Sequence, residues 1–253
     1  MLDSESVAEF NERGFIIERG LAPMSLCESM RRIALASLDP LLPPVEFETD
    51  VQYPGSPSDR LSPGGDTPRR LLNAYTRDEV FRRWAVSPEV AGRIGALLGC
   101  RQVALSQNHH NCLMTKHPGF SSATMWHQDI RYWLFDRPDL INVWLALGTE
   151  NQTNGGMCLI PGSHRLVLDR GRFDGALFFR EDIEENKAII DTAMPANLEC
   201  GDALFFHSRT LHAASRNHSD AVKLSLVFTY RDVDNLPLAG TRSAAYPDIP
   251  CDA

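Results

Sequence analysis

The chain has 253 residues, of which 43% are hydrophobic and 23% are charged, and its formal net charge is −8 at pH 7. This length suits one large domain, and no apolar run approaches the roughly 18 residues of a membrane span. An acidic chain without a basic cluster argues against a nucleic-acid partner, because that affinity depends on Lys and Arg side chains that neutralise phosphates.

The cellular setting follows from the termini and the cysteines. The N-terminus lacks the basic segment followed by an apolar one that is typical of a secretory signal. Six cysteines are scattered without a Cys-x-x-Cys motif, which suits buried thiols in a reducing compartment. We therefore expect a cytoplasmic protein with no membrane or nucleic-acid partner and no feature that indicates a protein partner.

Residues 1–99 are predicted to be mainly helical. Helices are expected over 4–13, ended by Gly14, and over 25–38, 69–84 and 88–98, the last ended by Gly99, with a short strand at 15–17. Residues 39–68 are rich in Pro, Gly, Ser and Asp, which predicts a loop. A loop of this length in a compact protein is usually functional or disordered, and a lid is one role open to it; the sequence does not indicate which loop acts as the lid.

From residue 100 to 231 the sequence changes to β-rich runs. These are 103–108, 112–115, 124–133, 141–147, 156–160, 188–191, 203–206 and 222–230. Turn sequences such as Asn154-Gly155-Gly156 and Pro161-Gly162-Ser163 separate them. We expect a single domain over 1–253: a mainly β, cupin-like jelly roll (a double-stranded β-helix) at 100–231, with the N-terminal helical region packed on the barrel and a C-terminal extension at 232–253.

The pair His127-x-Asp129 lies inside one of these runs. Residues two apart in a strand point to the same face, so this imidazole and carboxylate would project together. With one more distant histidine they would form the 2-His-1-carboxylate triad of non-haem Fe(II) oxygenases. Both His207 and His212 follow the run 203–206, and His212 is favoured because residues 208–210 can turn the chain, whereas His207 continues the strand.

The alternating run 222–230 places Lys223 and Ser225 on one face. An ammonium and a hydroxyl two residues apart suit a bound carboxylate. A lysine on an inward face is otherwise costly to bury. The pair is therefore a candidate anion clamp.

Several motifs resemble the phytanoyl-CoA dioxygenase (PhyH) family. They are His127-Gln128-Asp129 with Arg131-Tyr132-Trp133, Val143-Trp144-Leu145-Ala146-Leu147, Asn154-Gly155-Gly156, Pro161-Gly162-Ser163-His164, Gly201-Asp202 and the stretch 212–217. The resemblance covers about residues 71–230 and implies a jelly-roll fold, Fe(II), O2 and 2-oxoglutarate as cosubstrate. By position it implies that His127, Asp129 and His212 are iron ligands and that Trp144 lies beside the cosubstrate.

The cosubstrate clamp departs from the family pattern. Where the family commonly carries an arginine this chain has Lys223, which keeps the charge but loses the bidentate fork. Arg216, Arg231 or Arg242 are alternative clamps. Ala213-Ala214 stands where many relatives have Gly-Ser. We place Cys112 with Lys223, Ser225 and Trp144 at the cosubstrate site.

Further candidates for contacting substrate or supporting the site are Lys116, Arg131, Gln107, His109 and Arg242. Each has a plainer explanation, an exposed lysine or a solvated strand edge among them. Related halogenases lack the carboxylate, so Asp129 disfavours halogenation. The expected function is an Fe(II)/2-oxoglutarate-dependent dioxygenase that hydroxylates a small molecule and releases succinate and CO2. The alternatives are a cupin-like metalloenzyme that does not use 2-oxoglutarate and a catalytically inactive ligand-binding barrel.

Overall fold

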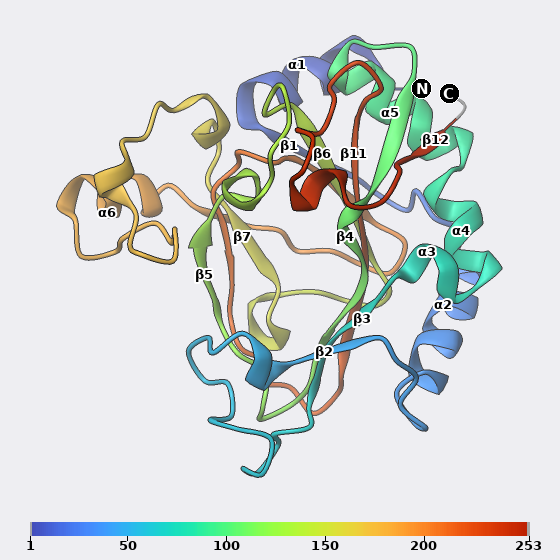
Figure 1. Ribbon diagram of the computed structural model, residues 1–253, viewed down its shortest axis with the longest axis vertical. Helices are drawn as coiled ribbons and strands as arrows, with labels where there is room; N and C mark the ends of the chain where they lie inside the picture. The colour runs from blue at the N-terminus through green and yellow to red at the C-terminus, as the bar shows by residue number, and fades with distance from the viewer. Residues whose placement is uncertain (1, 252–253) are drawn as a thin grey trace.

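Two antiparallel sheets with flanking helices make up this mainly β protein, as the computed structural model, which describes residues 2–251, shows (Figure 1). The large sheet has eight strands in the order β1-β9-β6-β11-β4-β3-β2, with β12 also paired to β4, and the small sheet has the order β5-β10-β7-β8. The strands are β1 (Phe15–Glu18), β2 (Val45–Phe47), β3 (Pro68–Leu72), β4 (Val103–Lys116), β5 (Thr124–His127), β6 (Leu140–Ala146), β7 (Met157–Leu159), β8 (Met194–Pro195), β9 (Ala203–His207), β10 (His212–Ala214), β11 (Lys223–Asp232) and β12 (Ile249–Cys251).

Helices cover the outer faces of the two sheets. Most come from the first hundred residues, and Figure 1 shows α2 to α5 on one side of the molecule and α6 on the opposite side. Their bounds are α1 (Ser4–Arg13), α2 (Met24–Ala36), α3 (Ala74–Arg77), α4 (Glu79–Ala85), α5 (Pro88–Leu98) and α6 (Glu184–Ile190). The predicted ends at Gly14 and Gly99 are confirmed, since both glycines adopt the left-handed conformation after α1 and α5.

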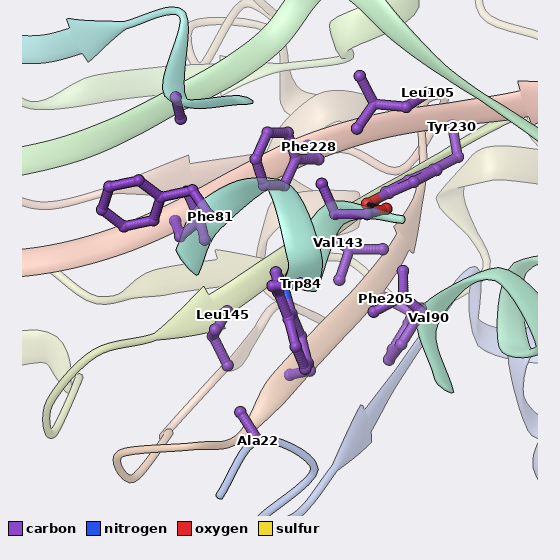
Figure 2. Close-up of a cluster of buried hydrophobic side chains, with 14 of the residues drawn as sticks. Ala22, Phe81, Trp84, Val90, Leu105, Val143, Leu145, Phe205, Phe228 and Tyr230 are labelled. Carbon is purple, nitrogen blue, oxygen red and sulfur yellow. Dashed lines mark hydrogen bonds between the residues drawn. The ribbon is translucent and has the colours of Figure 1, made fainter. Parts of the chain in front are cut away.

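The outer face of the large sheet carries the main hydrophobic core. Figure 2 shows Phe81 and Trp84 of α4 and Val90 of α5 packed against this face. The sheet contributes Val143, Leu145, Phe205, Phe228 and Tyr230. Because side chains alternate along a strand, the neighbours of these residues must point to the other face.

That inner face meets the small sheet in a second apolar cluster. Trp144 and Phe206 from the large sheet pack there with Met157 and Leu159 from β7. Polar residues on the same inner face, Asn142 among them, are fully or almost fully buried. The space between the two sheets is therefore where buried polar groups converge.

Two predictions for the N-terminal half need correction. Residues 69–84 are not one helix, because Pro68–Leu72 forms β3, which pairs with both β2 and β4, and the helices begin only at Ala74. Leu71 is buried in the core through this pairing, so sheet contacts override the helical spacing. The predicted loop over 39–68 also contains β2 and therefore supplies an edge strand of the large sheet.

Later in the chain, the predicted strand at 188–191 is wrong. Glu184–Ile190 is the helix α6, and the periodicity of a short apolar run does not distinguish a helix from a strand. The two runs at 103–108 and 112–115 join into the single strand β4. Within residues 2–251, no helix has the length and apolar character required to traverse a lipid bilayer.

Candidate metal centre

Three side chains converge between the sheets at the end of the small sheet. His127 is the last residue of β5, and His212 is the first residue of β10 and its cross-strand partner. The strand ends before Asp129, which instead opens a 3-10 turn, Asp129–Tyr132. Ligand atoms of the three residues all lie within 4.8 Å of one another, and within residues 2–251 this is the one such group of three His, Cys, Asp or Glu side chains.

The two imidazoles are oriented by backbone carbonyls. His127 Nδ1 lies 2.8 Å from the Met125 carbonyl oxygen, and His212 Nδ1 lies 3.0 Å from that of Thr210. An Nδ1–H donor in these bonds leaves each Nε2 lone pair free, the usual arrangement of a metal-binding histidine. The two Nε2 atoms lie 3.5 and 3.7 Å from the carboxylate oxygens of Asp129.

The protonation states also suit a cation. Burial lowers the pKa of His127, and burial together with the neighbouring His127 lowers the pKa of His212 to about 3. Burial alone would raise the pKa of Asp129, but His110, His212 and hydrogen bonds hold it well below its usual value. Two neutral imidazoles and one carboxylate are therefore present at neutral pH.

A hydrogen-bond chain fixes the Asp129 carboxylate. Asn142 Nδ2 donates to Asp129 Oδ2 at 2.7 Å, and Thr229 Oγ1 donates to Asn142 Oδ1 at 2.6 Å. His110 Nε2 lies 3.2 Å from the same carboxylate, and although burial opposes its protonation, Asp129 raises the pKa of His110 to about 9. These neighbours orient the carboxylate in the way that outer hydrogen bonds orient metal ligands.

A cavity of about 50 Å³ adjoins the three residues. Its wall includes the indole of Trp144 and three basic side chains, Arg69, Arg70 and Lys116. Arg69 and Arg70 both approach Glu46, at 3.4 and 3.3 Å, and Arg69 lies 3.6 Å from Glu48. The cavity wall thus combines apolar side chains such as Met157 and Phe206 with basic ones, and the two arginines already have carboxylate partners.

The predicted clamp has a partner within the protein. Lys223 Nζ lies 2.8 Å from Glu150 Oε2, and Ser225 Oγ donates to Glu150 Oε1 at 2.6 Å. Trp144 Nε1 lies 3.2 Å from both carboxylate oxygens. Lys223 and Glu150 are 3% and 1% exposed, so this is a fully buried ion pair.

The structure gathers three other predicted residues at a separate place. Gln107, His109 and Arg242 line a cavity of about 400 Å³ beside the C-terminal segment. His109 stacks on Trp133, with ring centroids 4.6 Å apart, and its Nε2 lies 2.9 Å from Ser243 Oγ.

The remaining candidates have structural contacts of their own. Arg131 lies over the Phe178 ring at 4.1 Å, and Cys112 is buried with its sulfur 3.7 Å from that of Met114. Arg216 donates to the carbonyls of Ser121 and Gly119, and Arg231 pairs with Asp248. His207 lies 3.5 Å from Asp139, outside the metal-ligand group.

Sequence reasoning missed several residues of the site. Asn142 lies two residues before Trp144 on β6, so strand alternation would have placed it on the inner face. Arg69 and Arg70 were missed because their segment was predicted as a helix. Glu150 lies between β6 and a 3-10 turn, and no pattern in the sequence marks it.

Comparison with known proteins agrees with this arrangement. Residues 10–225 match the family model described as phytanoyl-CoA dioxygenase (PhyH). The human peroxisomal phytanoyl-CoA dioxygenase is 25% identical over 250 residues, covering 92% of this chain and 70% of the relative.

Solved structures share the fold. The EctD structure from S. alaskensis with 2-oxoglutarate and 5-hydroxyectoine has a TM-score of 0.76 at 18% identity, covering 94% of this chain and 78% of that one. The epimerase SnoN in complex with Fe3+, alpha ketoglutarate and nogalamycin RO has a TM-score of 0.73 at 20% identity, covering 92% and 84%. The chain belongs to the phytanoyl-CoA dioxygenase (PhyH) family.

Proposed function

We propose that this protein is a non-haem Fe(II)- and 2-oxoglutarate-dependent oxygenase that hydroxylates a small molecule. The balanced reaction converts substrate C–H, O2 and 2-oxoglutarate into the alcohol, succinate and CO2. The observation that carries the proposal is the buried convergence of His127, Asp129 and His212 in a member of this family.

The donor set fits Fe(II). Two neutral imidazoles and one carboxylate would hold the ion, and bound iron would supply the oxidising chemistry. The protein's part is to hold Asp129 through Asn142 and to direct both Nε2 atoms inward. The apolar walls around them limit access of water.

We also propose that the two sheets are the halves of a double-stranded β-helix in one domain. The apolar cluster between their inner faces supports this arrangement, as does the likeness to the EctD and SnoN structures. In such a barrel the three residues that would hold the metal lie between the sheets.

One observation favours a second candidate, a metalloenzyme that does not use 2-oxoglutarate. Glu150 fills the Lys223–Ser225 clamp that would otherwise bind the cosubstrate. The two candidates differ in whether a metal-loaded protein binds an α-keto acid.

Anaerobic titration with Fe(II) and then 2-oxoglutarate tests the proposal. We expect a metal-to-ligand charge-transfer band, and succinate formation after O2 is admitted. The His212→Ala variant, which removes one ligand, should give neither. Iron binding without the band or succinate would favour the second candidate, and failure to bind iron would leave a catalytically inactive ligand-binding barrel.

A further inference from the structure

Two lysines lie side by side on the inner face of the large sheet. Lys116 of β4 and Lys223 of β11 are cross-strand partners in the register of these strands, and both are buried. Like charges directly opposite one another destabilise a sheet. Each ammonium therefore requires compensation, and the two receive it differently.

Lys223 is compensated inside the protein. The Glu150 carboxylate accepts hydrogen bonds from Lys223, Ser225 and Trp144, so its oxygen atoms have partners. The Glu150 backbone is held as well, because its N–H and C=O bond to Leu198 at 2.7 and 3.0 Å. Displacing this carboxylate would bury a charge without partners, which is strongly unfavourable.

Trp144, and not Lys223, lines the cavity at the metal ligands. Lys223 and Ser225 are absent from that lining, and Lys223 Nζ lies 5.0 Å from the centroid of the indole ring. The cavity wall is therefore formed by the indole and not by the ion pair.

Lys116 does line the cavity, and it is the lysine without a carboxylate. Among the described residues its ammonium bonds to the backbone carbonyls of Ser122, at 2.9 Å, and Ser215, and forms no salt bridge. Two carbonyls use two of its three donors. Room for its side chain depends on Gly155, where an added Cβ would lie 2.5 Å from Lys116 Cδ.

We propose that Lys116, and not Lys223, binds the distal carboxylate of an α-keto diacid cosubstrate, and that Glu150 is the internal counter-ion that reserves Lys223 and Ser225 for the fold. This inference rests on the proposed function. Lys116 is level with Lys223 across the sheet, so it offers a positive charge at the depth where the family resemblance places the clamp. Arg70 lines the same cavity, but its Nε lies 3.3 Å from Glu46 Oε1, so its charge already has a partner.

The charges favour a dianion. A divalent metal held by Asp129 and two neutral histidines would retain one positive charge. Burial and the neighbouring Lys223 lower the pKa of Lys116 to about 7, and a carboxylate bound beside it favours the charged ammonium, which supplies a second positive charge. A diacid matches both, whereas a keto monoacid leaves Lys116 without a partner. The cavity of about 50 Å³ is too small for a five-carbon diacid, so movable side chains such as Met114 must give way.

Calorimetric titration of the Mn(II)-loaded protein tests the assignment without requiring turnover. The two ligands are 2-oxoglutarate and pyruvate, which lacks the distal carboxylate. We expect Lys116→Met to raise the Kd of 2-oxoglutarate by about 10- to 100-fold, the usual cost of losing a hydrogen bond to a charged group. The Kd of pyruvate should stay within about threefold, which also shows that the variant is folded.

The matched control is the double variant Lys223→Met/Glu150→Gln, which removes both charges of the internal ion pair. We expect it to keep the wild-type preference for 2-oxoglutarate over pyruvate. Loss of that preference in the double variant, or an unchanged Kd in Lys116→Met, would overturn the inference and return the clamp to Lys223. If Lys116→Met does not fold, the double variant decides. If the wild-type protein binds metal but neither keto acid, the proposed function itself fails, and the inference fails with it.

Discussion

Replacing Lys223 by methionine should destabilise the protein, because the buried Glu150 carboxylate loses its counter-ion. The substitution keeps an unbranched side chain of similar length but leaves the Glu150 carboxylate, 1% exposed, with only Ser225 and Trp144 as donors. Removing one partner of a buried ion pair costs about 3–5 kcal/mol, because the other charge remains buried. Replacing both partners with groups of similar shape is far milder.

This cost converts into a measurable shift in Tm. At about 2.1 cal/mol/K per residue, the unfolding entropy of a chain of this length is roughly 0.5 kcal/mol/K. A loss of 3–5 kcal/mol then lowers Tm by about 6 to 9 °C. The double variant Lys223→Met/Glu150→Gln should recover most of that shift, since glutamine brings no charge.

Thermal and urea unfolding of the metal-free protein at pH 7.5, followed by circular dichroism, would measure both variants. Arg83→Met is the matched control: Arg83 pairs with Glu79 at 3.1 Å, but its side chain is 79% exposed, so we expect little change. The reasoning is refuted if Lys223→Met melts within about 1 °C of wild type, or if the double variant is as unstable as the single one.

Three further predictions concern the ligand support, the cavity wall and pH. Asn142→Leu removes the amide that donates to the ligand carboxylate and should weaken Mn(II) binding, measured by calorimetry, by about 10- to 100-fold. Gly155→Ala meets Lys116 at 2.5 Å and a φ of +82°, so it should lower Tm, whereas Gly92→Ala on α5, with open space around it, should not. Burial and a neighbouring histidine lower the pKa of His164 to about 4, so the unfolded chain binds this proton first and stability falls as pH falls from about 6.5 to 4. His164→Gln should therefore show a smaller loss of urea-unfolding free energy over that range, and an equal loss in both proteins would contradict the assignment.

The strand elements were predictable where alternation and turn residues agree. The run 203–206 and the run 222–230 appear as β9 and β11 because their alternating side chains face an apolar core on one side and the interior on the other. The same reasoning placed Lys223 and Ser225 on one face, and the structure has them bonded to one carboxylate. Prediction was poorest at 69–72, where apolar residues at helical spacing over 69–84 concealed a strand, and at 188–191, where a short apolar run fits a strand and a helix equally well.

The candidate metal ligands were predictable from their residue types and spacing, and not from the alternation of side chains along a strand. Asp129 does not share a strand face with His127, since β5 ends at His127 and a 3-10 turn follows. The turn nevertheless returns the carboxylate towards both imidazoles, within the same 4.8 Å group. The residue types and their spacing identified the group, but the orientation of the carboxylate depends on residues elsewhere in the sequence, such as Asn142, whose amide donates to it.

Which charges remain available at such a site depends on residues far away in the sequence. Lys116 and Lys223 are equivalent by strand pattern, and only the position of Glu150, on a loop after β6, makes one an internal ion pair and leaves the other facing the cavity. The pattern of β11 alone indicates that Lys223 is free to bind an anion, because it does not show that Glu150 is its partner. Because an uncompensated buried ammonium is costly, the lysine whose charge the protein leaves unmatched is the one that a bound anion stabilises most. That difference, and not the order of residues along β11, is why we expect cosubstrate affinity to follow Lys116 and fold stability to follow Lys223.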